Sequence, residues 1–244
     1  MAIRGCGRWL VDVLYPPRCF ACLRRTARPG LCRTCTSQVS WVPPAICRIC
    51  GIPFSGVAQR EHTCTRCLTK RPAYDQARAC AVYGDVGRGA SPLALALHRY
   101  KYDRDVTLAS PLARILADLC PLPPQHEILV PVPLHVARLR WRGFNQALLL
   151  AKLLAKRRGL RVAPSLLRRN RPTVPQVGLN EQDRRHNLKG AFSVADDRAV
   201  SGRSVLLVDD VLTTGATAEE CARSLRRAGA RQVDVLVLAR VALH

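Results

Sequence analysis

Two adjacent carboxylates and a hydroxyl-rich loop are the residues of this 244-residue sequence whose types and spacing most clearly indicate chemistry. Asp209 and Asp210 follow a short apolar run from Ser204 to Val208, which is typical of a buried parallel strand. A loop and a helical pattern from Ala218 to Ala228 come next, and the loop reads Thr213, Thr214, Gly215, Ala216, Thr217. The order is therefore strand, acidic pair, small loop and helix N-terminus.

This order predicts a site for a 5-phosphoribose group. A loop of small residues offers backbone N–H groups and hydroxyl donors, and the positive end of the following helix also favours a phosphate. The acidic pair suits the vicinal hydroxyls of a ribose, because each carboxylate accepts two hydrogen bonds. The alternative is that Asp209 and Asp210 only end a strand and that Thr213 or Thr214 only caps a helix.

A second strand candidate, Glu127 to Val132, leads into a basic segment that contains a glycine. A basic loop after a parallel strand is where an α/β sheet binds anions, and arginine offers two donors to one phosphate. We expect Arg138 and Arg142 to face a pyrophosphate, with Asn145 and Gln146 as polar positioning residues before an apolar helix. The alternative is a solvated run of arginines.

Eight of the twelve cysteines form four Cys-x-x-Cys pairs near the N-terminus. Two such pairs can hold one zinc ion with four thiolates, and closed sites of this kind are structural. The simplest sets are sequential, although spacing leaves a crossed pairing open. The two sequential sets are Cys19, Cys22, Cys32, Cys35 and then Cys47, Cys50, Cys64, Cys67. We therefore expect one or two structural zinc ions.

The remaining elements predict an α/β fold with a small zinc-binding module. Strands are expected at 78–83, 191–194 and 232–239, and helices at 92–100, 108–119 and 147–156. Residues 168–192 read as a long polar loop that closes over a substrate. His98 to Tyr102 interleaves basic and aromatic residues, a pattern that can contact phosphates and bases or simply pack. We expect a zinc module at 1–72 and an α/β domain at 73–244.

Charge and hydropathy narrow the class of protein. With 39 lysines and arginines against 17 acidic residues, the formal charge is +22, which favours polyanionic partners. No apolar run is long enough to cross a membrane, and we expect no signal peptide. A cytoplasmic protein is therefore expected, and there the cysteine pairs indicate metal binding rather than disulfides.

The strand with Asp-Asp-Val-Leu-Thr-Thr-Gly-Ala-Thr resembles the phosphoribosyl pyrophosphate (PRPP) signature of type I phosphoribosyltransferases. That resemblance implies a parallel sheet flanked by helices. It also implies that Asp209 and Asp210 bind the ribose 2- and 3-hydroxyls and that residues 213–217 wrap the 5-phosphate.

The order of motifs along nearly the whole chain is similar to that of the ComF family, competence-associated proteins with a double zinc ribbon and a phosphoribosyltransferase domain. The motifs are the cysteine pairs, His-Arg-Tyr-Lys-Tyr, Pro-Val-Pro-Leu with Arg-Gly-Phe-Asn-Gln, Gly-Ala-Phe, the PRPP signature and Val-Leu-Ala-Arg. The resemblance implies a link to natural transformation and to uptake of single-stranded DNA at the cytoplasmic side.

Two functions remain open at this point. In the first, the protein transfers 5-phosphoribose from PRPP with Mg²⁺ to an unknown nitrogenous acceptor, and the expected catalytic residues are Asp209, Asp210 and Arg142. In the second, the fold is a non-catalytic scaffold that senses a nucleotide and binds single-stranded DNA or a protein of the uptake machinery.

Overall fold

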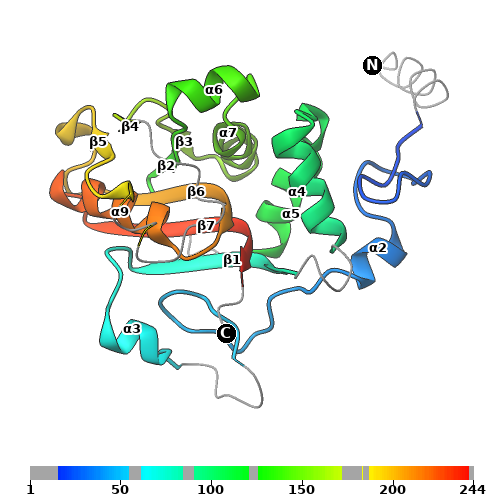
Figure 1. Cartoon of the computed structure of the whole chain (residues 1–244), viewed down its shortest axis with the longest axis horizontal. Coiled ribbons are helices and arrows are strands. Elements are labelled where there is room, and N and C mark those ends of the chain that lie inside the picture. The colour runs from blue at the N-terminus through cyan, green and yellow to red at the C-terminus, as the bar shows by residue number, and fades with distance from the viewer. Residues whose placement is uncertain are drawn as a thin grey trace.

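The computed structural model describes residues 16–54, 62–84, 91–120, 126–171, 183 and 187–241. Within these residues a five-stranded parallel sheet forms the centre, in the order β1-β7-β6-β2-β3 (Figure 1). A two-stranded antiparallel ribbon, β4 with β5, lies apart from it. The bounds are β1 Gln76–Tyr83, β2 Ile128–Pro131, β3 Arg161–Val162, β4 Leu167–Arg169, β5 Phe192–Val194, β6 Ser204–Leu212 and β7 Gln232–Val241. The predicted α/β class is confirmed.

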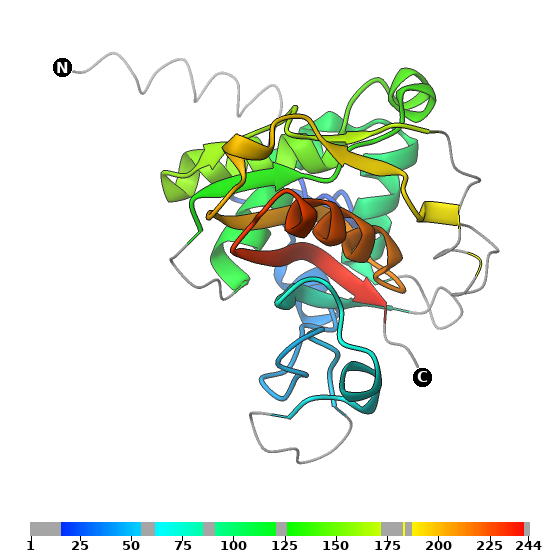
Figure 2. The ribbon, with the colours of Figure 1, turned by 90° about the vertical axis from the view of Figure 1, so that its left-hand side faces the viewer.

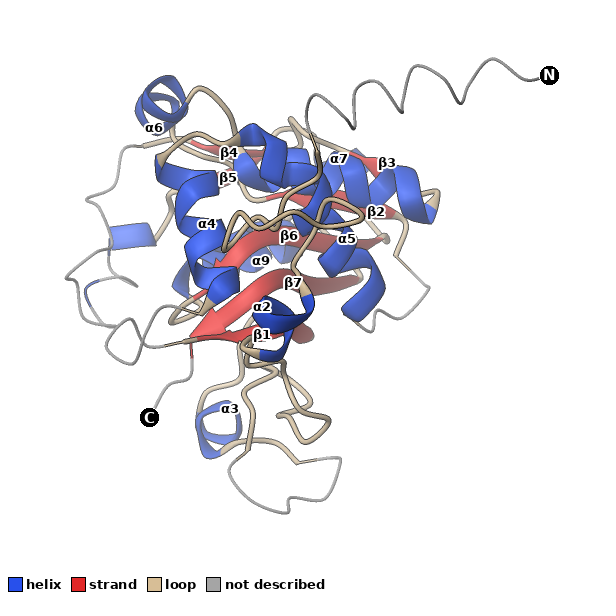
Figure 3. Cartoon of the chain, turned by 90° about the vertical axis from the view of Figure 1, so that its right-hand side faces the viewer, coloured by secondary structure: helices blue, strands red, loops and turns tan. Residues whose placement is uncertain are grey.

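The central strands are buried on both faces, because successive side chains point to opposite sides of a sheet. Val205 and Leu207 of β6 enter one core, while Leu206 and Val208 enter the other. The first core lies under α9, Ala216–Arg227, and the β4–β5 ribbon (Figure 2). The second lies under the helices of the opposite face (Figure 3). Those helices are α4 Pro92–Tyr102, α5 Ala109–Leu119 and α7 Gln146–Arg158.

The cysteine-rich segment, which carries the four cysteine pairs from Cys19 to Cys67, covers β1, an edge strand of the sheet. Three backbone hydrogen bonds join it to β1, from Val42 N to Cys80 O, from Val82 N to Ser40 O and from Ala77 N to Ile49 O. Covering an edge strand blocks pairing with other chains. Of the two short helices in the segment, α2 spans Arg33–Ser37 and α3 spans Thr65–Thr69.

The two halves of the cysteine-rich segment pack against different cores. Phe20 and Val39 join the core under α4, α5 and α7. Cys47, Cys50 and Cys67 join the core under α9. The second half is thus continuous with the packing of the α/β sheet, and the division into 1–72 and 73–244 stays a prediction.

Most predicted elements form with shifted ends, and one prediction is wrong. The basic loop that was expected to carry Arg138 and Arg142 is a helix, α6, Val136–Arg142. The His135 side chain caps its N-terminus by accepting from Ala137 N at 3.3 Å, and Gly143, with φ +84°, ends it. Local capping residues set both ends of α6, and the run of arginines between them gave no clear sign of a helix.

Two short strands were not predicted. β3 has two residues and β4 three, too few to show a clear alternation of apolar and polar side chains. Arg168 therefore belongs to β4 rather than to a polar loop. Residues 172–182 and 184–186 of the expected closing loop lie outside the described residues.

In the part of the chain that the structure describes, no helix combines the length and apolar content needed to cross a membrane.

Truncating the core between the sheet and α4, α5 and α7 should destabilise the protein strongly. Leu206→Ala removes a fully buried side chain, so we expect unfolding to become easier by about 2–5 kcal/mol in chemical denaturation. Leu95→Ala, on the outer face of α4 and 44% exposed, is the matched control and should change stability by only about 0.5 kcal/mol. Equal effects would contradict the two-layer packing.

Candidate active site and metal centres

The acidic pair lies near the carboxyl end of β6, and Asp210 faces the last turn of α4. Asp210 is 3% exposed, and its Oδ2 atom lies 2.7 Å from the Nζ atom of Lys101. β6 continues through Leu212, so both carboxylates belong to the strand rather than to the turn after it. The sequence pattern had placed Lys101 in a basic and aromatic patch without connecting it to the carboxylates.

Each carboxylate is also held by the backbone. Asp209 Oδ1 accepts from Asp210 N, and Asp210 Oδ1 accepts from Val211 N, both at 2.9 Å. Burial and the charge of Asp210 raise the pKa of Asp209 well above its usual value, while Lys101 opposes the rise. Burial lowers the pKa of Lys101, but the Asp210 carboxylate outweighs burial and raises it. The pair therefore has the Lys101 ammonium as its immediate counter-charge, and Asp209 holds a proton more strongly than an ordinary aspartate.

The loop after β6 is shorter than predicted. Thr213, Thr214 and Gly215 form it, while Ala216 and Thr217 open α9. Gly215 is the N-cap of α9 and adopts φ +84°, a backbone conformation that residues other than glycine rarely adopt. Thr214 Oγ1 accepts from Ala216 N at 3.4 Å. The loop precedes the positive end of a twelve-residue helix, an arrangement that favours an anion.

Arg142 and Arg138 lie on α6 in different environments. Arg142 is buried, and its Nη1 donates to Gln146 Oε1 at 2.8 Å. Burial lowers the pKa of Arg142, and the charge of Asp210 acts in the opposite direction. Arg138 is exposed on the same helix. The structure therefore places Arg142 within the electrostatic reach of the acidic pair and Arg138 at the surface beside it.

The two predicted positioning residues hold the backbone around Arg142. Asn145 caps α7 by accepting from Leu148 N at 3.2 Å, and its amide donates to Val132 O at 3.1 Å. Gln146 fixes the Arg142 guanidinium, and its backbone carbonyl accepts from the Tyr100 hydroxyl at 3.0 Å.

Residues beyond the sequence prediction complete the surroundings. The guanidinium of Arg169, on β4, lies 5.5 Å from the centre of the Phe192 ring. Burial lowers the pKa of Arg169, and the charge of Asp209 opposes this effect without cancelling it. Tyr102 and Trp141 lie 6.3 Å apart between ring centroids, and the Arg142 guanidinium lies 5.7 Å from the Tyr102 ring. Both rings are about half exposed, at 47% and 50%. The segments that contain Tyr102, Trp141 and Arg169 were singled out from the sequence, but neither Trp141 nor Arg169 was given a role in the site.

The eight paired cysteines form two groups of four, each with its sulfur atoms within 4.8 Å of one another. The sets are the sequential ones, Cys19, Cys22, Cys32, Cys35 and Cys47, Cys50, Cys64, Cys67. One sulfur pair in each set, Cys22 with Cys32 and Cys50 with Cys64, is separated by 3.7 Å. Four thiolates about 2.3 Å from a tetrahedral zinc ion would lie about 3.8 Å apart. Both groups therefore fit a zinc ion.

Backbone N–H groups prepare two of these sulfurs to bind metal. Burial raises the pKa of Cys19, but the N–H groups of Cys22 and Cys32 outweigh it and lower the pKa to about 6. In the second group the pKa of Cys47 is lowered to about 7, because the N–H groups of Cys64 and Cys50 outweigh burial. Both thiols thus ionise readily, and the thiolate is the form that binds metal.

The second cysteine group is joined to the loop between β6 and α9, Thr213 to Gly215, which we call the phosphate loop after the group we expect it to bind. Arg66, between the ligand candidates Cys64 and Cys67 on α3, donates from Nη2 to Thr214 O at 2.9 Å. Ala73 N donates to Glu219 Oε2 at 2.8 Å, and Arg240 donates to Cys50 O. The α3 segment and the start of α9 therefore hold each other in place.

The fold and the two sites define a phosphoribosyltransferase-type domain joined to a double zinc ribbon. The family models agree: residues 10–68 match the double zinc ribbon domain, and residues 155–242 match the phosphoribosyl transferase domain.

Whole-chain relatives then identify the family. Competence protein F from Haemophilus influenzae is 34% identical over 235 residues, covering 91% of this chain and 96% of that protein. DNA utilization protein YhgH from Escherichia coli K12 is 34% identical and covers 86% of this chain and 90% of that protein. Competence protein ComFC from Bacillus subtilis is 27% identical, covering 82% and 79% respectively. The chain belongs to the ComF family.

The two cysteine groups should respond differently to mutation. Cys19→Ser and Cys67→Ser are each expected to lower the zinc content from two ions per chain to about one, because each removes one ligand of a different group. Cys67→Ser should lower the thermal unfolding temperature more, since Cys67 is part of the core under α9 and Cys19 is not. Metal analysis and calorimetry measure both effects; equal temperature shifts would contradict the shared core.

The charges around Asp209 predict opposite effects of two neighbouring substitutions. Asp210→Asn removes a negative charge, so the pKa of Asp209 should fall toward its usual value. Lys101→Met removes the opposing positive charge, so the pKa should rise further. Carbon-detected NMR titration of the Asp209 carboxyl group measures both, and shifts in the same direction would contradict the arrangement.

The same pKa has a consequence for stability. A pKa raised by folding means that the protonated carboxyl favours the folded state, and this contribution is lost as the pH rises through the folded-state pKa. In urea unfolding, the free energy of unfolding of the native protein relative to Asp209→Asn should therefore fall as the pH rises from the ordinary pKa of an aspartate to the raised folded-state pKa. A pH-independent difference would contradict the raised pKa.

Proposed function

We propose that the protein binds PRPP in the cytoplasm, with the ribose at the acidic pair and the 5-phosphate at the loop before α9. The observation that carries the proposal is the continuity of the unit: Asp209, Asp210, the turn at Gly215 and the N-terminus of α9 follow one another on one strand and one helix. The carboxylates accept hydroxyl hydrogens, while the helix end and the loop N–H groups bind phosphate.

The pyrophosphate end of PRPP extends from the ribose toward α6 in this proposal. Arg142 is close enough to Asp210 for the carboxylate to affect its pKa, and Arg138 lies one turn away on the same helix. Mg²⁺ bound together with PRPP would screen the negative charge of the pyrophosphate. Lys101 would then either contact the ligand or move from Asp210 when the ribose enters.

The reaction we propose is transfer of 5-phosphoribose to a nitrogenous acceptor. The bond between ribose C1 and the pyrophosphate oxygen breaks with its electron pair on pyrophosphate, a new bond forms from an acceptor nitrogen to C1, and the acceptor loses a proton. Positive charge develops on the ribose ring, and the buried Asp210 and half-buried Asp209 would stabilise it. Arg142 would stabilise the departing pyrophosphate.

A second function is favoured by the surface beside the site. Tyr102 and Trp141 expose their rings among arginines, with Arg104 5.6 Å from the Trp141 ring. Exposed aromatic rings with cations bind single-stranded nucleic acid by stacking and by charge. Together with the net charge of +22 and relatives named for competence and DNA utilization, this favours a non-catalytic role in DNA uptake, with single-stranded DNA or an uptake protein as partner.

Removing both carboxylates tests the site directly. In isothermal titration of zinc-replete protein with PRPP and Mg²⁺, the double variant Asp209→Asn, Asp210→Asn should bind at least about 100-fold more weakly, since hydrogen bonds to two charged groups are lost. Asp118→Asn with Asp197→Asn, on the exposed surface, is the charge-matched control and should bind normally. Normal affinity in the first variant would refute the proposed site.

Turnover is tested separately by pyrophosphate release in the presence of a panel of nitrogenous bases. Release that needs both PRPP and one acceptor, and that is lost in the acidic-pair variant, supports the transferase. PRPP binding without release for any acceptor, combined with binding of single-stranded DNA that is lost in Tyr102→Ala with Trp141→Ala, supports the second function.

A further inference from the structure

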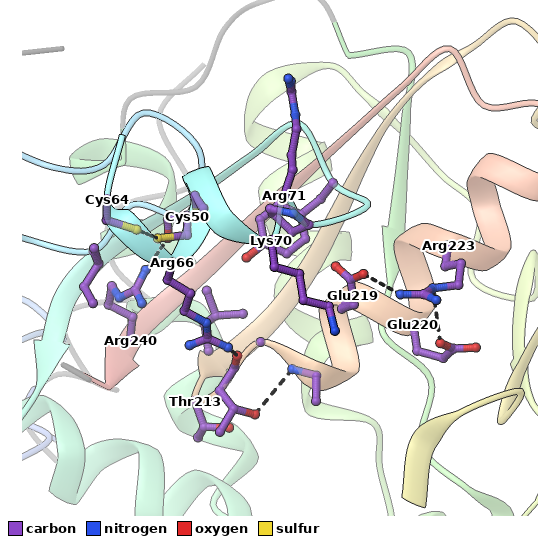
Figure 4. A pocket seen from close by; sticks show the side chains of 18 of the residues that line it. Cys50, Cys64, Arg66, Lys70, Arg71, Thr213, Glu219, Glu220, Arg223 and Arg240 are labelled. Carbon is purple, nitrogen blue, oxygen red and sulfur yellow. Dashed lines mark hydrogen bonds and ion pairs between the residues drawn. The ribbon is translucent and has the colours of Figure 1, made fainter. Parts of the chain in front are cut away.

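A cavity of about 790 Å³ lies between the second cysteine group and the start of α9 (Figure 4). One wall comes from α3 and the residues after it, and the opposite wall from the phosphate loop and α9. The acidic pair does not line it. The cavity is therefore separate from the proposed position of the ribose hydroxyls, but it shares residues Thr213 to Gly215 with the proposed 5-phosphate position.

The cavity has an apolar part and an excess of positive charge. Ile52, Tyr74 and Leu212 contribute apolar surface. Arginines pair with both carboxylates of the lining: Arg223 lies 2.7 Å from Glu219 and 3.6 Å from Glu220, and Arg227 lies 3.7 Å from Glu220.

Three further cations of the lining have no ion pair or side-chain hydrogen bond within the described residues. They are Lys70, Arg71 and Lys189, all exposed. Figure 4 shows Lys70 reaching from the cysteine-rich side across the cavity toward α9. The excess charge thus comes from two separate parts of the chain: Lys70 and Arg71 follow α3, and Lys189 belongs to the segment before β5.

We propose that this cavity binds a nucleoside monophosphate at a second site, which shares the loop Thr213 to Gly215 with the proposed PRPP site but not the acidic pair. Its volume lies in the range of small-molecule sites, about 300–1,000 Å³. Apolar surface beside Tyr74 suits the base, and Lys70, Arg71 and Lys189 suit the phosphate dianion. Neither inorganic phosphate nor an apolar compound alone would use both parts of the cavity.

Occupation of this site would act on the phosphate loop. The loop forms part of the cavity wall, and Arg66 in the opposite wall already holds Thr214 O. A nucleotide that contacts both walls would stabilise or shift that connection, and any effect on PRPP affinity would be reciprocal. This coupling rests on the proposed function, whereas nucleotide binding in the cavity does not.

The test is isothermal titration of the zinc-replete full chain with AMP, GMP, CMP, UMP and inorganic phosphate. At least one nucleotide should bind at least about tenfold more tightly than inorganic phosphate. Lys70→Ala with Lys189→Ala should weaken that binding at least about tenfold, since two charge-assisted contacts are lost. The exposed pair Lys152→Ala with Lys156→Ala on α7 is the charge-matched control and should bind as the native protein does.

The acidic-pair variant separates this site from the proposed PRPP site. Asp209→Asn with Asp210→Asn should retain nucleotide binding within about twofold, because neither residue lines the cavity; loss of binding there would place the nucleotide in the PRPP site and overturn the proposal. Binding of none of the four nucleotides, or equal weakening in the control pair, would also overturn it. Zinc content and unfolding temperature, measured on every variant, identify any that misfold.

Discussion

The ion pair between Lys101 and Asp210 is the interaction on which the arrangement of the site depends. Two carboxylates stand next to each other near the end of a buried strand, where burial and mutual repulsion both disfavour their charge. Backbone N–H groups stabilise them locally, but the ammonium comes from a different element. The last turn of α4 must therefore stay beside β6, and the packing of α4 against the sheet through residues such as Leu97 and Tyr100 keeps it there.

The cysteine-rich segment is part of the same construction. It covers the edge strand β1, contributes Cys47, Cys50 and Cys67 to the core under α9, and reaches the phosphate loop through Arg66. A metal ion bound by the second cysteine group would fix α3 and hence the position of the Arg66 side chain. Zinc in the ribbon would then help to fix the loop after β6, where we propose that the 5-phosphate binds.

Site residues that are neighbours in the sequence could be predicted, whereas those brought together only by the fold could not. Asp209, Asp210, Gly215 and the start of α9 were predicted because they are contiguous, and their chemistry depends on local order. Lys101, Arg169 and Trp141 were not assigned to the site, because tertiary packing alone brings α4, β4 and α6 to β6. Cysteine spacing identified the ligand candidates, but only the sulfur positions distinguish sequential from crossed sets. The helix α6 was predicted as a loop, since arginines favour helix and solvated loop alike and its capping residues gave no strong signal.

In our proposal, the strand-loop-helix unit from β6 to α9 binds PRPP. The decisive experiment is a crystal structure of the zinc-replete protein with PRPP and Mg²⁺. We expect ribose hydroxyls within hydrogen-bond distance of Asp209 and Asp210, the 5-phosphate on the N–H groups of residues 213–217, and the pyrophosphate beside α6. PRPP bound elsewhere on the protein, or no PRPP in the map at saturating concentration, would contradict it.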